Sequence, residues 1–436
     1  MNKSLSPIET HPIDEILATA PPMLSQALLR AQENSPFWAR KFKHLGFEAH
    51  ANVPLDDFLN FPLLDKAEIL DDQLKHGPYG QLLAVPQDEL SRVHRTSGTT
   101  AAPLMVLLSK NDIRDVVEVG ARAFRCAGVT PQDSIIHCLN YCMWAGGYTD
   151  HQSLESAGGM VVPFGVGNSQ YLIQTILRLR PTAISCTPSY LSRLEQVLHD
   201  EFNKTPIELG LSKAFLGGEG GMQNPDVRKG IEEKWGMLAI DANYGLSDVL
   251  SIIGSECGDR SGLHFHAQNV LFPELVDHTG DMLNLTAGAV GELVLTNLQR
   301  EAQPLFRYRT HDIIRIESTE LCSCGRRGFR FRVIGRSDDM ITVKGINFFP
   351  NSIHGLFSNQ PNLSGDYRIV MHRNNPQDIS IEVERAPNGQ ADWEQLAAIL
   401  KKQISVEFSV SSKIHFVEYG HLPKSENKTN RVIWKE

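Results

Sequence analysis

The sequence predicts an α/β protein with two parts: a large N-terminal domain, built of βαβ sheets and a β-rich subdomain, and a small α+β C-terminal domain. Three observations predict this class. Between about residues 112 and 240, short apolar runs alternate with amphipathic helical patterns, as in the βαβ units of a largely parallel sheet. After about residue 255, strand patterns with polar turns dominate. The last stretch, of about 100 residues beyond Arg336, has strand and helix patterns with apolar positions of its own.

The first segment of the chain is predicted to be helical. Met23, Leu24 and Leu28 recur at helical spacing. Gly46 is expected to end this helix, because glycine adopts left-handed backbone angles at little cost.

The middle of the chain is predicted to alternate strands with helices. The expected strands are Ser134–Asn140, Gly159–Pro163, Ala183–Cys186, Lys213–Leu216 and Met237–Ile240. The expected helices are His151–Ala157, Gln170–Leu179, Ser189–Leu198 and Pro225–Trp235. In parallel sheets of this kind, ligands bind beyond the carboxyl ends of the strands, so a site is expected in the loops there.

The β-rich subdomain is expected over about residues 255–335. Its predicted strands are Glu292–Thr296, Leu305–Arg309, Asp312–Ile316 and Phe331–Ile334. The last segment is predicted to contain the strands Tyr367–Met371, Ile379–Glu384 and Lys413–Val417 and a helix near Trp393–Ile404. We therefore expect an N-terminal domain over residues 1–337 and a C-terminal domain over residues 338–436.

Composition excludes several classes of function. Lys and Arg number 42 against 51 Asp and Glu, a net charge of −9, which argues against a nucleic-acid-binding protein and against electrostatic docking on anionic lipid. We expect no signal peptide and no membrane-spanning segment. Seven cysteines scattered over 436 residues favour a reducing, cytoplasmic environment over a disulfide framework.

A loop dense in hydroxyl groups follows the apolar–polar stretch Leu90–His94. Its sequence is Thr96-Ser97-Gly98-Thr99-Thr100-Ala101-Ala102-Pro103. Hydroxyls and exposed backbone N–H groups in a tight loop can bind phosphate. No lysine follows, which separates this loop from the GxxxxGK[ST] type. By itself, the segment is equally compatible with a Ser/Thr-rich surface turn.

Four further segments combine charged, hydroxyl and aromatic residues. They are Asn243–Asp248 (NYGLSD), Tyr308–Asp312 (YRTHD), Gly335–Met340 (GRSDDM, followed by Lys344-Gly345) and Leu422–Lys428 (LPKSENK). The first could stack on a base and hold Mg²⁺ through a carboxylate, and the second could bind ribose hydroxyls at a strand start. The third suits a hinge, and the lysine of the fourth could deliver charge to a phosphate. Each segment also has an interpretation without a function. In the same order, these are a capped strand end, a charged turn, a solvated linker and a solvated tail.

In their order along the chain, these segments resemble those of the phenylacetate–coenzyme A ligase family, a branch of the adenylate-forming enzymes. The resemblance covers nearly the whole chain. It also includes SPFW at Ser35–Trp38, FPLLDK at Phe61–Lys66, GPYG at Gly77–Gly80, TPSY at Thr187–Tyr190 and GGE at Gly217–Glu219. It implies an ATP-dependent acid–thiol ligase that forms an acyl-adenylate with ATP and Mg²⁺ and transfers the acyl group to coenzyme A.

The resemblance implies a role for each matching residue. The implied nucleotide-binding residues are Ser97, Gly98, Thr99, Thr100, Gly218, Glu219, Tyr244, Gly245, Asp312 and Arg336. Ser247 is implied to touch the α-phosphate, and Asp248 to hold Mg²⁺. Lys428 is implied to be the catalytic lysine of adenylation, and Asp338 the hinge of a mobile C-terminal domain. Lys344 and Gly345 are implied to line the coenzyme A tunnel.

The sequence departs from the family pattern at three places. Ala101 and Ala102 stand where glycine and then lysine or a similar residue are usual, which alters the backbone freedom of the loop. Asp248 replaces the commoner glutamate and is shorter by one methylene. Asn427 replaces glycine, although asparagine also tolerates left-handed angles. None of these changes removes a required functional group.

A metal site is predicted around a C-x-C-G turn at Cys322–Gly325, which has the shape of a zinc knuckle. Upstream lie Cys257 and His264, with His266 as a rival ligand. Cys322, Cys324, Cys257 and one histidine would complete a closed Cys₃His set, which is typical of structural Zn²⁺. The resemblance supports this set, because Gly262-Leu263-His264 matches the family's GLH. The alternative is a group of free thiols in a reducing cell.

The substrate pocket is the least specified part. Tyr141, Trp144, Gly146 and Gly147 follow a predicted strand and match the segment that packs on the aryl ring in the family. Trp144 replaces a smaller aromatic, which favours a short or flat aryl or arylacetic acid, although hydrophobic pockets discriminate weakly. Tyr141 and Trp144 could instead belong to the core. His137, Asp150 and His151 are nearby polar residues that could meet a hydroxyl or amino substituent.

Two alternatives to a coenzyme A ligase stay open. The enzyme could pass its acyl group to a carrier protein or an amine, because the sequence contains no carrier domain. It could also be an inactive nucleotide-binding module with a zinc knuckle, which the presence of Lys428, Asp312 and Asp248 disfavours. The sequence also leaves open whether the chain forms a homodimer.

Overall fold

A computed structural model describes residues 5–96, 103–338, 341–343, 346–358, 360–372, 375–387, 389–408, 410–422 and 431–435. The chain divides into two compact units. The larger unit comprises Met1–Gly218, Trp235–Thr310 and Ile314–Arg332, and the smaller unit comprises Glu219–Lys234, His311–Ile313 and Val333–Glu436. The domain boundary between residues 337 and 338 stays a prediction.

Helices fill the first segment. After a 3₁₀ turn (η1, Pro7–Thr10) come α1 (Ile13–Asn34), α2 (Pro36–Leu45), α3 (Leu55–Leu59) and α4 (Lys66–His76). The predicted helix is therefore two helices, because Ser35 leaves helical angles and caps α2 by accepting a hydrogen bond from the N–H of Trp38. Gly46 ends α2 in the left-handed conformation (φ 65°), which confirms its predicted role.

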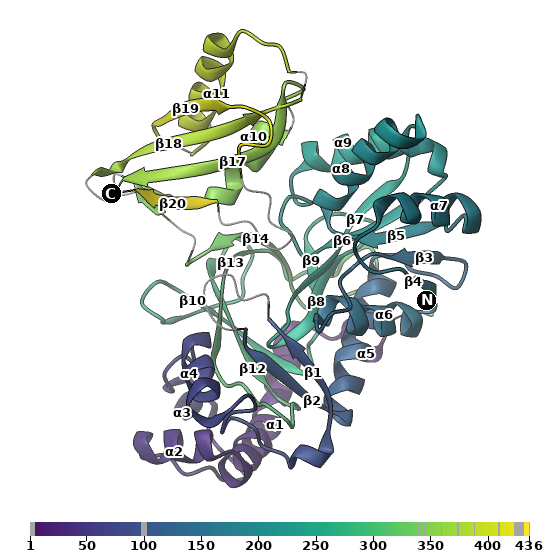
Figure 1. Ribbon diagram of the computed structural model, residues 1–436. Coiled ribbons are helices and arrows are strands. Elements are labelled where there is room, and N and C mark those ends of the chain that lie inside the picture. The colour runs from purple at the N-terminus through teal and green to yellow at the C-terminus, as the bar shows by residue number, and fades with distance from the viewer. Residues whose placement is uncertain are drawn as a thin grey trace. The chain divides into compact units, whose positions relative to one another are not determined.

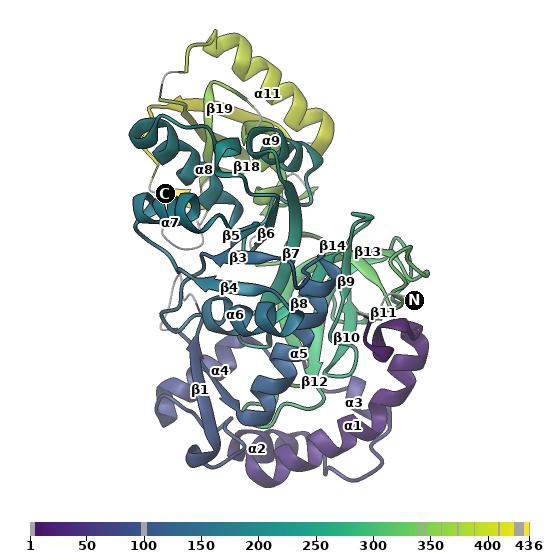
Figure 2. The ribbon, with the colours of Figure 1, turned by 90° about the vertical axis from the view of Figure 1, so that its right-hand side faces the viewer.

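An antiparallel pair and a long helix follow. After a 3₁₀ turn (η2, Gln87–Glu89), strand β1 (Leu90–Arg95) pairs with β2 (Met105–Ser109). Helix α5 (Lys110–Cys126) begins at Ser109, whose side chain and that of Asp112 form a reciprocal capping box. Helix α5 packs on α6 and β8 (Figure 2).

The alternating region contains a parallel sheet, as predicted. Its strands are β3 (Ser134–His137), β4 (Met160–Pro163), β5 (Ala183–Cys186), β6 (Lys213–Gly217) and β7 (Leu238–Leu246). They are paired in the order β4-β3-β5-β6-β7, all parallel. The intervening helices are α6 (Ala145–Ala157), α7 (Ser169–Leu179), α8 (Pro188–Val197) and α9 (Pro225–Trp235), with a π turn η3 (Leu198–Phe202) and a 3₁₀ turn η4 (Pro206–Leu209).

The β-rich region extends this sheet. Its strands are β8 (Leu250–Glu256), β9 (Leu263–Phe265), β10 (Leu271–Val276), β11 (Met282–Leu283), β12 (Val290–Asn297), β13 (Tyr308–Ser318) and β14 (Arg330–Arg336). Together the strands form one sheet in the order β11-β10-β12-β13-β14-β9-β8-β7-β6-β5-β3-β4. Figure 1 shows the parallel strands β5, β6 and β7 beside β8 and β9. Strand β7 is the junction, because it is parallel to β6 but antiparallel to β8.

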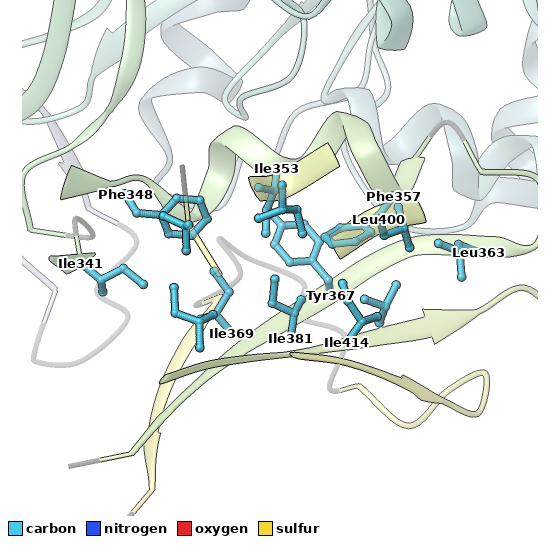
Figure 3. Close-up of a cluster of buried hydrophobic side chains, with 14 of the residues drawn as sticks. Ile341, Phe348, Ile353, Phe357, Leu363, Tyr367, Ile369, Ile381, Leu400 and Ile414 are labelled. Carbon is cyan, nitrogen blue, oxygen red and sulfur yellow. The ribbon is translucent and has the colours of Figure 1, made fainter. Parts of the chain in front are cut away.

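The smaller unit has a sheet and core of its own. Its elements are β15 (Ile341–Val343), β16 (Ile346–Phe348), η5 (Pro350–Ile353), α10 (His354–Ser358), β17 (Leu363–His372), β18 (Asn375–Arg385), α11 (Trp393–Phe408), β19 (Ser412–Val417) and β20 (Val432–Lys435). The sheet order is β19-β18-β17-β20. Leu396, Leu400 and Ile404 of α11 belong to one buried apolar cluster with Ile381 and Tyr367. Figure 3 shows Leu400, Ile381 and Tyr367 among its side chains. This α+β arrangement is the one predicted.

Several predicted elements were wrong in extent. The expected strands Leu305–Arg309 and Asp312–Ile316 are one strand, β13, which continues through His311 although that residue has φ 60°. Asp312 therefore lies inside a strand and not at a strand start. Strand Ser134–Asn140 ends at His137, and helix His151–Ala157 begins earlier, at Ala145.

Strand β7 also differs from the prediction. It runs on to Leu246, so Tyr244 and Gly245 lie at its carboxyl end and not in a loop behind it. Among the described residues, no helix is long and apolar enough to cross a membrane.

Candidate active site

The NYGLSD segment lies at the junction of the parallel and antiparallel parts of the sheet. The Tyr244 ring packs edge-on against Phe331, with 5.2 Å between ring centroids. A Cβ atom at Gly245 would come within 2.0 Å of the carbonyl oxygen of Ser251, so only glycine allows β7 and β8 to approach so closely. Ser247 follows in the turn and is partly exposed.

Asp248 is a buried carboxylate with a cationic partner. Its Oδ2 accepts a hydrogen bond of 2.5 Å from the Tyr308 hydroxyl and lies 3.3 Å from Nζ of Lys66. Burial raises the pKa of Asp248, but the Lys66 ammonium and the Tyr308 hydroxyl outweigh it and hold the pKa below its usual value. The group is therefore an anion at neutral pH. Sequence reasoning missed Lys66 and Tyr308 as its partners, although both lie in segments that carry the family resemblance.

A second cation supports the same turn. The buried Arg300 guanidinium donates to the backbone carbonyl oxygens of Val249 (2.8 Å) and Leu107 (3.2 Å). It thereby ties the turn after Asp248 to strand β2. No pattern in the sequence pointed to this residue, because its partners are backbone atoms far away along the chain.

Gly218 and Glu219 lie just after β6, and both are exposed. Gly218 has φ +77°, a left-handed conformation that favours glycine. This is the carboxyl edge of a parallel strand, the place at which the fold class predicts a ligand.

In the smaller unit, three predicted residues lie together. Arg336 donates to Asp312 at 3.0 Å, and its Nε and Nη2 donate to the two oxygens of Asp338 at 2.8 and 2.7 Å. His311 contacts Ser337 through its backbone carbonyl (2.7 Å) and its ring (3.1 Å). The structure thus brings the predicted ribose-binding, nucleotide-binding and hinge residues into one ion-pair network.

The predicted acyl wall forms the start of α6. Tyr141 and Trp144 are partly exposed, and Gly147 is buried. A Cβ atom at Gly147 would lie 2.1 Å from the carbonyl oxygen of Asn140, so the chain can fold back here only with glycine. The Tyr141 hydroxyl is hydrogen-bonded to Nδ1 of His151 at 2.9 Å.

His137 is hydrogen-bonded to the backbone of Gly146 and Gly147. Its Nε2 lies 3.1 and 3.0 Å from the carbonyl oxygens of Gly146 and Gly147, and its Nδ1 lies 3.1 Å from the Ser185 hydroxyl. Since both carbonyls can only accept, Nε2 carries the proton. Burial lowers the pKa of His137 to about 4, so the ring is neutral at pH 7 and acts as a fixed hydrogen-bonding support.

The predicted metal ligands gather at one place. The ligand atoms of Cys257, His264, Cys322 and Cys324 all lie within 4.8 Å of one another. Two of the separations are 3.6 Å, between Sγ of Cys257 and Sγ of Cys322 and between Sγ of Cys324 and Nε2 of His264. His266 is engaged elsewhere, by Glu9 at 3.2 Å and Ser255 at 2.9 Å. Of the two rival histidines, the structure therefore places His264 with the cysteines.

A fourth thiol lies beside this cluster. Cys126, at the end of α5, is buried against Cys257 and Cys322. Burial raises the pKa of Cys126 well above its usual value, so it is a neutral thiol. Sequence reasoning missed it, because it lies far upstream and belongs to no cysteine motif.

Comparison with known proteins identifies the family. One family model, for the AMP-binding enzyme C-terminal domain, matches residues 345–435. The chain is 32% identical to the phenylacetate-coenzyme A ligase of Pseudomonas putida over 438 residues, which cover 99% of this chain and 97% of that protein. It is also 32% identical to the enzyme of the same name from Thermus thermophilus, over 98% of each. The chain belongs to the phenylacetate–coenzyme A ligase family.

Solved structures agree with this assignment. A 2-hydroxyisobutyryl-CoA ligase in complex with 2-HIB-AMP matches with a TM-score of 0.85 at 26% identity, over 98% of this chain and 91% of that one. An anthranilate CoA ligase shares the fold, with a TM-score of 0.60 at 17% identity, over 80% of this chain and 67% of that one. The fold class is thereby confirmed, and the chain is an AMP-forming acid–CoA ligase that uses ATP and coenzyme A.

Some of the family positions lie outside the described residues. They are Ser97, Gly98, Thr99 and Thr100 of the phosphate loop, Lys344 and Gly345 of the coenzyme A segment, and Lys428 of the LPKSENK segment. Their roles stay predictions.

Proposed function

We propose that this ligase activates an aryl or arylacetic acid as its acyl-adenylate and then forms the acyl-CoA thioester. The observation that carries the proposal is the near full-length match to phenylacetate-coenzyme A ligases at 32% identity. The acyl wall between β3 and α6 supports it, because Tyr141 and Trp144 directly precede the Gly146-Gly147 pair in the first turn of α6, after the carboxyl end of a parallel strand.

The proposed reaction has two steps. A carboxylate oxygen of the acid attacks the α-phosphorus of ATP, and the bond to pyrophosphate breaks. The thiol of coenzyme A then attacks the acyl carbon, and AMP leaves. Such phosphoryl chemistry depends on positioning and charge neutralisation, which we assign to the SGTT loop, Ser247 and Lys428. Tyr244, Gly245, Gly218 and Glu219 would surround the base, and Asp312 and Arg336 the ribose.

Asp248 is the residue proposed to hold Mg²⁺. It fits that role because its carboxylate is an anion at neutral pH, held by Lys66 and Tyr308, and carboxylate oxygens are the ligands that Mg²⁺ prefers. When bound, the metal would neutralise charge on the phosphate oxygens. Asp338 is proposed as the hinge, and Lys344 and Gly345 as part of the coenzyme A path.

We also propose that Cys257, His264, Cys322 and Cys324 hold a structural Zn²⁺ ion. Four ligands at about 2.0–2.3 Å in a tetrahedron lie roughly 3.5–3.8 Å apart, and the two separations of 3.6 Å fit this geometry. Cys324→Ser should reduce bound zinc below about a tenth of an equivalent and lower the melting temperature by several °C. Cys142→Ser, which changes an exposed cysteine, should keep one zinc per chain. Zinc-free wild type would refute the site.

One experiment identifies both the acid that is activated and the acceptor of its acyl group. The purified protein, ATP and Mg²⁺ would be incubated with benzoic and arylacetic acids, and with short hydroxy acids because the structural relative acts on one. Pyrophosphate release would be followed with and without coenzyme A, and products identified by mass. An aryl-CoA product supports the proposal. An acyl-adenylate without thioester would indicate a carrier protein or amine as acceptor, and no turnover would favour an inactive nucleotide-binding module.

A further inference from the structure

A buried aspartate lies directly behind the acyl wall. Asp150 is on α6, one turn after the Gly146-Gly147 pair, and its side chain is fully buried. A Cβ atom at Gly146 would lie 3.6 Å from Oδ2 of Asp150. The carboxyl group therefore lies next to Gly146, one of the two glycines of the proposed acyl wall.

Asp150 has two neutral donors and, among the described residues, no cationic partner. The Ser251 hydroxyl donates to its Oδ1 at 2.5 Å, and the Asn243 side-chain amide donates to its Oδ2. Ser251 is on β8 and Asn243 on β7, so three separate elements meet at this carboxyl group. A buried carboxyl group with two donors and no ion pair is costly, which indicates a role other than stability.

The hydrogen bonds fix which way the two partners face. Because the amide nitrogen of Asn243 points to Asp150, its amide oxygen Oδ1 points the opposite way, and no described residue donates to it. The Ser251 oxygen has two lone pairs, of which at least one is left to accept. Asn243 and Ser251 are partly exposed, whereas Asp150 is not. A ligand in front of them would meet hydrogen-bond acceptors.

These acceptors lie where the acid and the nucleotide are proposed to meet. Asn243 directly precedes Tyr244 and pairs with Gly217 at the carboxyl edge of β6 and β7. A Cβ atom at Gly217 would lie 2.4 Å from Cβ of Asn243, so the glycine makes room for the asparagine side chain. Gly245 lies against the backbone of Ser251, since a Cβ atom there would come within 2.0 Å of the Ser251 carbonyl oxygen. The backbone thus holds both acceptors in place.

We propose that Asp150, Asn243 and Ser251 form a specificity site that selects carboxylic acids carrying a hydroxyl or amino group. Asn243 and Ser251 accept the hydrogen bond, and Asp150 is a positioning residue that orients both. This inference rests on the proposed function. A bound acid would cover these acceptors, and an analogue without the donor is disfavoured because the covered acceptors are then left unpaired.

The experiment compares matched acids on the full-length enzyme. The pairs are isobutyrate and 2-hydroxyisobutyrate, benzoate and 2-aminobenzoate, and phenylacetate and 4-hydroxyphenylacetate. Methoxy derivatives serve as size controls without a donor. We expect kcat/KM for thioester formation to be at least about tenfold higher for the donor-bearing acid of the preferred pair than for its parent and its methoxy derivative. Equal or better use of the parents would overturn the inference.

Single substitutions test which side chains produce the preference for acids that carry a hydrogen-bond donor. Asn243→Leu and Ser251→Ala should each lower the donor preference at least about tenfold, mainly through KM of the donor-bearing acid, and leave the parent acid within about threefold. Asp150→Asn, which can still accept from Asn243 and donate to Ser251, should largely keep the preference. Ser153→Ala is the matched control, because its hydroxyl donates to the Thr149 carbonyl on the same helix and takes no part in the Asp150 group.

The outcomes separate this inference from the proposed function. A preference that survives in both Asn243→Leu and Ser251→Ala would overturn the specificity site while leaving the ligase activity intact. If these variants do not fold, the wild-type panel of matched acids decides by itself. No thioester from any acid would count against the proposed function and, with it, against this site.

Discussion

Two buried aspartates in the larger unit differ in what surrounds them. Asp150 and Asp248 are 0% and 7% exposed, and burial alone raises the pKa of both. Asp248 faces the Lys66 ammonium and the Tyr308 hydroxyl, and its pKa is lowered. Of the residues that the structure describes, Asp150 is bonded to the neutral donors Ser251 and Asn243, which do not offset burial, and its pKa is raised to about 8. A neighbouring cation, more than burial, therefore decides whether a buried carboxyl group is charged at pH 7.

The difference matches the two proposed roles. An anion at Asp248 suits the binding of a metal ion beside phosphates. A largely neutral carboxyl group at Asp150 still accepts from the Asn243 amide on one oxygen and shares its own proton with the Ser251 hydroxyl on the other. It therefore keeps Asn243 oriented without placing a fixed negative charge beside the carboxylate of the acid. Changing either carboxyl group, or one of its partners, tests this assignment.

The largest effect is expected from Asp248→Asn. This change keeps the shape of the side chain but removes its negative charge, so the proposed metal ligand is lost. We expect the rate of pyrophosphate release to fall by about 10²- to 10³-fold, the range seen when a single electrostatic contact to the transition state is removed. Asp56→Asn, at an exposed position of α3, is the control. A rate within about threefold of wild type would refute the assigned role.

A smaller effect is expected from Tyr308→Phe. The Tyr308 hydroxyl donates a 2.5 Å hydrogen bond to Asp248. Without this hydroxyl, Lys66 is the remaining partner of the carboxylate, and the orientation of the carboxylate is less fixed. We expect pyrophosphate release to slow by roughly tenfold, in line with a hydrogen bond to a charged group. Tyr171→Phe, on the exposed face of α7, should have no effect. An unchanged rate in Tyr308→Phe would mean that Lys66 alone positions Asp248.

The same comparison shows what the sequence could and could not predict. Local patterns located β5 and α9 with their observed bounds, because apolar runs and helix starts are encoded over a few neighbouring residues. They divided β13 in two, because the polar run Arg309–Asp312 has the composition of a turn, although burial alternates through it and the strand continues.

The partners of the two aspartates were beyond local patterns. Asp150 meets Asn243 and Ser251 across 93 and 101 residues of chain. Such pairs depend on strand order and register. Motif resemblance identified Asp248 but not Lys66, since a motif records which residues recur and not which atoms meet.

The cation at Asp248 can be tested by pH. In Lys66→Met the carboxylate loses its ammonium partner at 3.3 Å, and its pKa should rise. The acidic limb of the pH profile of kcat/KM for pyrophosphate release should therefore move to higher pH than in wild type. The matched control is Lys75→Met, which removes a lysine of the same helix that pairs with Asp71 on the surface. An acidic limb that stays in place would show that another group controls it.

The last and smallest effect concerns stability at Asp150. Its pKa is about 8 in the folded chain against an ordinary aspartate value of 3.8. Between these values the unfolded chain releases the proton and the folded chain keeps it, so wild type loses stability as pH rises from about 4 to 8. Asp150→Asn does not titrate. Its melting temperature relative to wild type should therefore increase by a few °C between about pH 5 and pH 8.5.

Asp248→Asn should show the opposite trend. The folded-state pKa of Asp248 is lowered, so its ionised form stabilises wild type above the unfolded pKa and that stability is lost as pH falls. Other titratable groups near Asp150 are His137 on β3, Tyr141 and His151. His137→Gln therefore serves to separate their titration from that of Asp150. The melting-temperature difference between Asp150→Asn and wild type could instead stay constant across this pH range. That result would mean that Asp150 is ionised in the folded protein, and that its two donors alone cancel the effect of burial on its pKa.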